Sequence, residues 1–338
     1  MEKILQQVKN NIYENNLIED NDVIVLGVSG GPDSIFLLHA LDVLKPIIKQ
    51  EKGISYELHV AHVNHMIRKE AGLDQEVARQ AAKKTNATFH LLETDVVKEA
   101  KRLKIGTEEC GRNIRYDFFE QVRKTVNATK IAVAHNVGDN AETILLNVLR
   151  GAGIQGLSGI EFKNNNIIRP ILNVAKEDII EYLESKNIGY TIDKTNFEND
   201  YTRNKIRNDL IVKIQKEYNP NIINTLNRMS VINKLDEKII ENTVKEKYEE
   251  LNVIKEKDKI VLDIRKFNKL ELGIKYRIIR KILEELLGDL RHIEMIHVKD
   301  ICRLLENNIT NKQYILGNKY KVVIEKKNIA IFVALCKK

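Results

Sequence analysis

The chain has 338 residues, of which 43% are hydrophobic and 30% charged, a composition that is typical of folded domains and argues against a disordered chain. This length allows two domains, each with its own core. The formal net charge of +7 would favour a polyanionic partner, but Lys is abundant throughout, so charge alone does not indicate RNA.

The same sequence gives no sign of export or of a membrane segment. Its apolar runs are too short to cross a bilayer, and the N-terminus lacks the long apolar region of a signal peptide. Cys110, Cys302 and Cys336 are widely separated and form no C-x-x-C motif. Reduced thiols in a cytoplasmic protein are the simplest explanation.

The N-terminal part of the chain alternates between strand and helix patterns after an amphipathic helix at residues 1–20. We expect strands at 23–28, 56–62, 88–93, 130–134 and 167–169, and a last extended stretch at 190–192. Helices are expected from residue 35 and at 73–85, 108–126, 139–149 and 176–187. Such βα repeats predict an α/β fold with a doubly wound parallel sheet, whose ligands bind beyond the carboxyl ends of the strands.

From about Tyr218 the alternation stops. The pattern predicts a connecting helix at 222–240, further helices at 276–287 and 295–305, and an antiparallel pair of strands at 320–324 and 329–333. We therefore expect two domains, residues 1–217 and a second, mainly helical α+β domain at 218–338. The second domain also carries a group of basic residues, each of which is about as typical of a solvated helix face as of a binding surface: Lys275, Arg277, Arg280, Lys281 and Arg291.

A glycine turn between the first strand and its helix is the strongest local signal. It comprises Ser29, Gly30, Gly31, Pro32, Asp33 and Ser34. Glycines let the backbone approach a phosphate, and the free N–H groups of the helix start point at it. No Lys follows the glycines as in a P-loop, and the dinucleotide pattern G-x-G-x-x-G is absent. The turn resembles the SGGxDS loop of the N-type ATP pyrophosphatases, which implies transfer of AMP.

Residues 135–143 form a second motif at the end of the fourth expected strand. Asp139 and Glu142 lie three residues apart at a helix start, where they could simply cap the helix. Their place at the mouth of the sheet equally fits carboxylates that hold Mg²⁺ or a substrate ammonium. His62 and His135 also end strands, so we expect them to converge with Ser29 on one site.

Two basic clusters are weaker indications of a functional site. Arg112, Arg115 and Tyr116 belong to one expected helix, and Arg203 and Arg207 to another helix start. Each cluster alone is more typical of a solvated helix face than of a site.

Together these stretches resemble the tRNA(Ile)-lysidine synthetase family. The similarity covers about residues 20–210 and includes the glycine turn, the His-rich segment at 59–68, residues 112–116, the 135–143 motif, the segment at 150–160, Arg169-Pro170, Arg203-Asn204 and Arg207. Gly138 stands where the family often has an aspartate, and Cys110 and Gly111 stand where it usually has alanines. Longer members carry a second C-terminal domain for which this chain has no room.

The resemblance implies a ligase that uses ATP and Mg²⁺ to join L-lysine to the wobble cytidine of the CAU-anticodon tRNA(Ile). By motif position, the glycine turn, His62 and His135 would bind the nucleotide, and Asp33 and Asp139 would bind Mg²⁺. Asp33, Arg112, Asp139, Glu142, Arg203 and Arg207 would be the catalytic residues. The basic residues of the second domain would then be candidates for a tRNA-binding surface. A homodimer is expected from the resemblance alone.

Two questions stay open at this point. Glu142, Asp139 and His135 are all candidates for accepting the proton of the attacking lysine amine. The alternative activity is that of a related PP-loop enzyme that thiolates tRNA or otherwise modifies a tRNA base with ATP, although the paired cysteines of the cytidine-thiolating type are absent.

Overall fold

A computed structural model describes residues 1–66, 71–192, 202–288, 290, 293–317 and 320–335. Residues 67 and 68 of the His-rich segment, Arg291 and Cys336 lie outside the described residues. The chain divides into two compact units, Met1–Lys234 and Leu235–Lys338, and the division falls within one long helix, α11 (Ile222–Glu250). The proposed functional domains, 1–217 and 218–338, remain a prediction.

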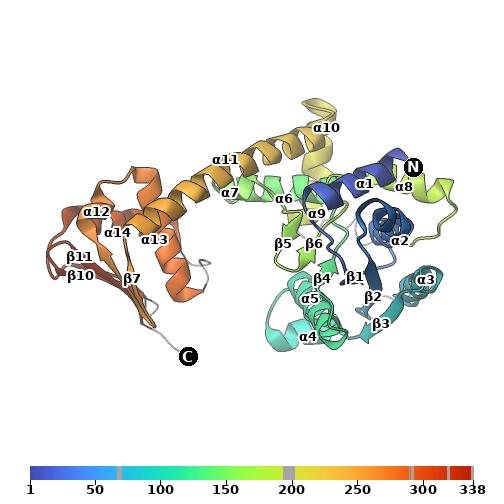
Figure 1. Ribbon diagram of the computed structural model, residues 1–338, viewed down its shortest axis with the longest axis horizontal. Helices are drawn as coiled ribbons and strands as arrows, with labels where there is room; N and C mark the ends of the chain where they lie inside the picture. The colour runs from blue at the N-terminus through green and yellow to red at the C-terminus, as the bar shows by residue number, and fades with distance from the viewer. Residues whose placement is uncertain (67–70, 193–201, 289, 291–292, 318–319, 336–338) are drawn as a thin grey trace. The chain divides into compact units, whose positions relative to one another are not determined.

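The first unit is built on a sheet with the strand order β3-β2-β1-β4-β6-β5 (Figure 1). All neighbouring strands run parallel except β5 and β6, which pair antiparallel at the edge. The strands are β1 (Asp22–Gly27), β2 (Tyr56–Asn64), β3 (Thr88–Glu93), β4 (Lys130–Ala132), β5 (Lys163–Asn164) and β6 (Ile167–Ile168).

Helices cover both faces of this sheet. Ile24 and Leu26 of β1 face a core with α1, α2 and α8, whereas Val25 faces Phe118 and Phe119 of α5 on the opposite side. Burial on both faces explains why the central strands are continuous apolar runs. The helices of this unit are α1 (Lys3–Glu14), α2 (Pro32–Lys52), α3 (Ala71–Lys84), α4 (Val96–Leu103), α5 (Thr107–Thr125), α6 (Val137–Leu149), α7 (Ile154–Leu157), α8 (Lys176–Ser185), α9 (Thr202–Lys205), the π-helical segment η2 (Ile206–Ile211) and α10 (Val212–Glu217).

The predicted alternation is confirmed, with local differences. The first helix ends at Glu14, because Asn16 adopts a left-handed conformation (φ 47°) and the Leu17 amide bonds back to the Ile12 carbonyl. The stretch at 190–192 is not a strand. Instead, the Thr191 amide donates to the Gly30 carbonyl, which ties this segment to the glycine turn.

The second unit pairs helices with an antiparallel sheet in the order β7-β8-β11-β10-β9. Its strands are β7 (Ile254–Glu256), β8 (Lys259–Asp263), β9 (Gln313–Leu316), β10 (Tyr320–Lys326) and β11 (Ile329–Ala334). Its shorter helices are α12 (Ile264–Asn268), α13 (Leu272–Leu287) and α14 (Met295–Asn307). The unit holds more sheet than expected, since β7, β8 and β9 are too short for a clear period-two pattern. Among the described helices, none combines the length and apolar character needed to cross a bilayer.

The core of the second unit gives a stability prediction. Phe332 of β11 is fully buried, so Phe332→Ala should lower the free energy of unfolding by about 3–5 kcal/mol through lost burial and a residual cavity. Ile315 of β9 in the same sheet is 51% exposed, and Ile315→Ala should change it by less than about 0.5 kcal/mol. Urea unfolding followed by circular dichroism measures both. Equal effects of the two variants would contradict the assigned core.

Candidate active site

Hydrogen bonds within the glycine turn fix its conformation. The Ser34 hydroxyl donates to the Gly31 carbonyl (2.9 Å) and accepts from the Ser29 amide (3.1 Å). Gly30 has φ +95°, and a Cβ there would lie 2.9 Å from the Asp74 carbonyl oxygen, so only glycine fits without strain. Pro32 then starts α2. The turn therefore presents backbone and the N-terminus of a long helix, the geometry that binds anions.

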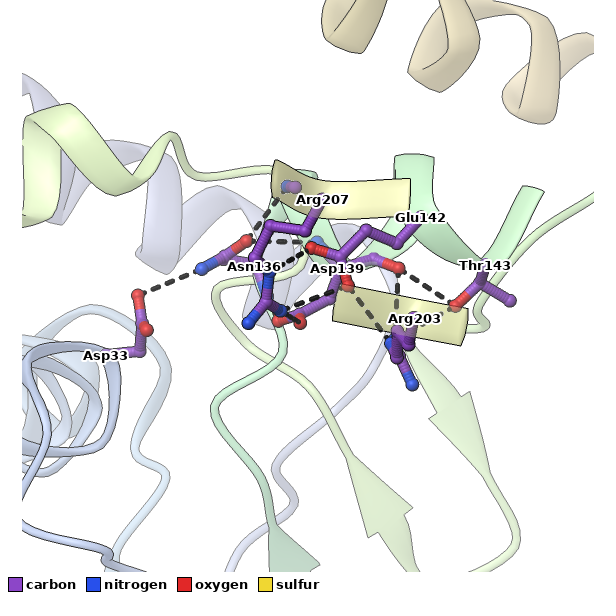
Figure 2. Close-up of polar contacts among 8 residues, drawn as sticks. Asp33, Asn136, Asp139, Glu142, Thr143, Arg203 and Arg207 are labelled. Carbon is purple, nitrogen blue, oxygen red and sulfur yellow. Dashed lines mark hydrogen bonds and ion pairs between the residues drawn. The ribbon is translucent and has the colours of Figure 1, made fainter. Parts of the chain in front are cut away.

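Asp33 follows Pro32 in the first turn of α2 and reaches across to the start of α6. The Asn136 side-chain amide donates to Asp33 Oδ1 at 2.9 Å (Figure 2). Burial raises the pKa of Asp33, and the charge of Asp139 raises it further, while the Asn136 hydrogen bond and Lys176 act in the opposite direction. Because its charged form lacks solvation, Asp33 is a carboxylate that a bound cation would stabilise.

Asn136, and not Asp139, caps helix α6. Its side-chain oxygen accepts from the amides of Gly138 and Asp139, at 2.8 and 3.2 Å. The Asp139 carboxylate accepts a hydrogen bond from the backbone N–H of Asn136 at 3.0 Å, which completes a capping box. The capping alternative, with Asp139 as the cap and Glu142 folding back to it, is therefore wrong: Asn136 is the cap, Asp139 folds back to it, and Glu142 takes no part.

Glu142 instead forms an ion-pair cluster with two arginines (Figure 2). Its carboxylate is only 3% exposed, and it accepts from Arg203 Nε at 3.0 Å and from both Nε and Nη2 of Arg207. Arg207 Nη2 also reaches Asp139 Oδ1 at 3.2 Å. Burial of a carboxylate is tolerated when it is paired in this way. Asp139, Glu142, Arg203 and Arg207 thus form one acid–arginine cluster.

The cluster arises from elements far apart in sequence. Arg203 lies in α9 and Arg207 in the π-helical segment η2, whereas Glu142 lies one turn into α6. Apolar contacts hold these elements together, since Ile206 and Ile211 of η2 pack with Ala141 and Ile144 of α6.

A cavity of about 450 Å³ lies next to the glycine turn. Of the predicted site residues, the structure places Ser29, Gly31, Pro32, Asp33, Ser34, His62, Arg112 and His135 in its wall. Gly30 shapes the turn without lining the cavity. The acid–arginine cluster does not line it either, but Asn136 connects that cluster to Asp33.

Three histidines in the cavity wall are held neutral by burial. His62 hydrogen-bonds the Val28 carbonyl through Nδ1 (2.8 Å), and burial lowers its pKa. Burial lowers the pKa of both His65 and His135 to about 4, with the Arg115 charge adding to the effect at His65. Arg169 Nε donates to His135 Nδ1 at 3.1 Å, so the neutral ring carries its hydrogen on Nε2. His135 is therefore poorly placed to accept a further proton.

Comparison with known proteins places this site in a family. A profile of the PP-loop domain matches residues 1–214. The tRNA(Ile)-lysidine synthase of Clostridioides difficile (strain 630) is 38% identical over 330 residues, which cover 97% of this chain and 70% of that protein. The chain belongs to the tRNA(Ile)-lysidine synthase family. It is thereby an ATP-using ligase of the PP-loop class, and the main interpretation of the sequence is supported over the thiolase alternative.

Other relatives agree. The tRNA(Ile)-lysidine synthase of Caldanaerobacter subterraneus subsp. tengcongensis is 37% identical over 310 residues, 91% of this chain and 65% of that protein. Among solved structures, the U34-tRNA thiolase NcsA of Methanococcus maripaludis aligns with a TM-score of 0.54 at 16% identity, over 69% of this chain and 79% of that one. That likeness reports the shared fold only. It confirms the α/β class predicted for the first unit.

The contacts of three residues of the candidate site are not predicted by the sequence. Asn136 lies within the 135–143 motif, but its bond to Asp33 joins residues 103 positions apart, which no local pattern encodes. Arg169 precedes Pro170 in another conspicuous segment, and its contact with His135 joins residues 34 positions apart. Lys176 lines the cavity, whereas the sequence predicts only that a helix begins there.

The burial of His135 predicts a pH dependence of stability. Because the folded protein keeps the ring neutral, it binds fewer protons than the unfolded chain between pH 6.5 and about 4. The free energy of unfolding should therefore fall as the pH drops through this window. His135→Asn retains an acceptor near Nδ1 but does not titrate. Its loss of stability from pH 7 to pH 5 should be smaller than that of the wild type by about 1–2 kcal/mol.

Urea unfolding at the two pH values measures this difference. His65 titrates in both proteins, so its contribution cancels in the comparison. Identical pH dependence of the two proteins would contradict the burial of a neutral His135.

Proposed function

We propose that this chain ligates L-lysine to C2 of the wobble cytidine (position 34) of the CAU-anticodon tRNA(Ile). In the first step, O2 of the cytidine attacks the α-phosphorus of ATP and pyrophosphate leaves. In the second, the ε-amine of lysine attacks C2, and AMP leaves with its electron pair on O2. The observation that carries the proposal is the anion-binding turn at residues 29–34, coupled through Asn136 to a buried acid–arginine cluster, in a chain of this family.

The first step requires groups that hold the leaving phosphates. The free amides at the start of α2 and the turn at Gly30 and Gly31 are suited to this task. Mg²⁺ commonly binds through one or two carboxylates plus the phosphates of the substrate. Asp33 fits that requirement, since burial leaves its charge poorly solvated and only Oδ1 is used by Asn136. When bound, Mg²⁺ would offset the negative charge of the phosphates.

Asp139 suits Mg²⁺ less well than Asp33 does. Its Oδ2 accepts from the backbone N–H of Asn136 and its Oδ1 accepts from Arg207, so both oxygens already have hydrogen bonds. In the described residues, no group of three or more His, Cys, Asp or Glu side chains is arranged to hold a metal ion by itself. We therefore assign Mg²⁺ chiefly to Asp33, with Asp139 as a further ligand only if its bond to Arg207 opens.

The second step requires a binding site for an ammonium group that then loses a proton. A free lysine amine has a pKa near 10.4, so its neutral form at pH 7 costs about 4.6 kcal/mol. Asp139 and Glu142 supply two negative charges, which are now paired with Arg203 and Arg207. Lysine would share these carboxylates with Arg203 and Arg207. We favour Asp139 or Glu142 over His135 as proton acceptor, because Arg169 already occupies Nδ1 of His135.

Arg112 is our candidate for steadying the phosphate or the cytidine adduct. Its guanidinium lies over the Tyr116 ring, 5.0 Å from the centroid, and it lines the same cavity as Asp33. Stacking on one face leaves the N–H groups at the edge of the guanidinium available for phosphate oxygens.

We assign contacts with the body of the tRNA to the second unit, with a narrower basic surface than the sequence suggested. Lys275 is buried and paired with Glu306 at 2.9 Å, and Arg277 forms a bidentate pair with Glu237 at 2.7 and 2.9 Å. Both side chains are therefore better suited to stabilising the second unit than to binding RNA phosphates. Arg280 and Lys281 remain candidates. We also expect a cytoplasmic protein, because its cysteines are widely separated, and a homodimer, as the resemblance implies.

Pyrophosphate release tests the proposed reaction and the role of Asp33. Purified protein with ATP, Mg²⁺, lysine and unmodified CAU-anticodon tRNA(Ile) should release pyrophosphate and AMP and incorporate lysine into the tRNA. Asp33→Asn keeps an acceptor for Asn136 but loses the charge, and it should slow pyrophosphate release roughly 100-fold or more. Asp117→Asn, an exposed position on α5, is the control and should be unchanged.

If the wild type releases pyrophosphate but incorporates no lysine, the proposed nucleophile is wrong. Full activity of Asp33→Asn would remove Asp33 from the site.

A second variant separates the two steps. Glu142→Gln leaves Arg203 and Arg207 short of a buried negative charge, and it should destabilise the fold by about 1–3 kcal/mol. At a temperature where it stays folded, adenylation of the tRNA should persist while lysine addition falls roughly 100-fold, so adenylated tRNA accumulates. Label from α-³²P-ATP on the tRNA measures this. Glu181→Gln, exposed on α8, is the control. Unchanged lysine addition would rule out Glu142 as a lysine-binding residue.

A further inference from the structure

The first residue of helix α8, Lys176, lines the cavity beside the phosphate turn. The cavity wall includes Ser29, Asp33 and Ser34 of the turn together with Lys176, which lies 142 positions after Ser34 in the chain. The charge of Lys176 acts on Asp33, whose pKa it lowers against the dominant effect of burial. Lys176 is therefore electrostatically coupled to the turn.

The placement of Lys176 follows from the packing of α8. Helix α8 packs against α2, the helix that begins at the turn, and Phe36 and Tyr182 meet edge to face with their centroids 5.3 Å apart. Just before α8, the Val174 carbonyl accepts from the Val137 amide at the start of α6 at 3.1 Å. The start of α8 is thus fixed to both of the elements that build the site.

Two features make a purely structural role for Lys176 a poor explanation. In the described part of the chain, no hydrogen bond or ion pair engages its ammonium group. A cation in the first turn of a helix is also at the unfavourable end of the helix dipole, where Glu177 and Asp178 are the favourable residues. A positive charge that lines the cavity there, with no hydrogen-bond or ion-pair partner among the described residues, points to an anionic ligand.

The phosphate turn itself lacks such a cation. A P-loop places a Lys directly after its glycines, whereas here Asp33 occupies the turn and adds negative charge. The leaving pyrophosphate carries several negative charges, which must be offset as the bond between the α-phosphorus and its bridging oxygen breaks. Arg112 comes from α5, which packs on the opposite face of the sheet from α2.

We propose that Lys176 binds the β- and γ-phosphates of ATP and stays with the leaving pyrophosphate, as the cation that the turn itself does not provide. The ammonium remains protonated and donates hydrogen bonds to phosphate oxygens, so no proton is transferred. The inference rests on the ATP-dependent adenylation proposed above, and it assigns a specific phosphate contact within it.

Nucleotide binding tests this role without tRNA or lysine. Calorimetry with Mg²⁺ would compare AMP with α,β-methylene-ATP, which cannot be split between its α- and β-phosphates. Lys176→Met should weaken binding of the triphosphate analogue at least 10-fold and change AMP binding less than twofold. Lys176→Arg should restore most of the lost affinity. Lys49→Met, which removes one exposed charge at the far end of α2, is the control and should match the wild type.

Either of two results would overturn the proposal. One is an affinity of Lys176→Met for the triphosphate analogue within twofold of the Lys49→Met control. The other is an equal loss of AMP and analogue binding, which would indicate a damaged pocket. The outcome is independent of the lysidine reaction, since a wild type that fails to modify tRNA could still discriminate between the nucleotides through Lys176.

Discussion

The side chain of Asn136 joins the two halves of the candidate site. Its oxygen caps helix α6, and its amide nitrogen donates to Asp33 at the start of α2. One amide therefore sets the distance between the phosphate turn and the acid–arginine cluster. An aspartate could cap the helix as well, but it would place a second negative charge against Asp33. The Asn136 amide supplies an acceptor to the helix and a donor to the carboxylate at once, without adding charge.

Two effects set the charges around Asn136: arginines pair with the buried carboxylate, and burial keeps the nearby histidines neutral. Glu142 remains almost inaccessible to solvent because two guanidinium groups satisfy its oxygens. His62, His65 and His135 are kept neutral, so the cations of the cavity wall are arginine and lysine side chains. A site of this kind retains its positive charge over a wide pH range, because guanidinium and ammonium groups do not titrate near neutrality.

The sequence predicted those parts of the site whose residues are neighbours in the chain. The turn at residues 29–34 and the run of βα units were recognisable because glycine conformation and apolar periodicity are local properties. The roles of Asn136 and Lys176 were not, since each depends on a partner more than 100 positions away. Asp139 shows the intermediate case. Its spacing to Glu142 suggested a capping pair, but the structure pairs it with Asn136 and leaves Glu142 to the arginines.

The π-helical segment that carries Arg207 restricts how this part of the chain can change in length. A π-helical turn accommodates one residue more than an α-helical turn, as if a residue had been inserted into a regular helix. Arg203 precedes the segment and Arg207 lies inside it, yet both reach Glu142. Deleting one residue between them would shorten their spacing from four residues to three and rotate one arginine around the axis relative to the other. An insertion or deletion here would separate one of the two guanidinium groups from their shared carboxylate.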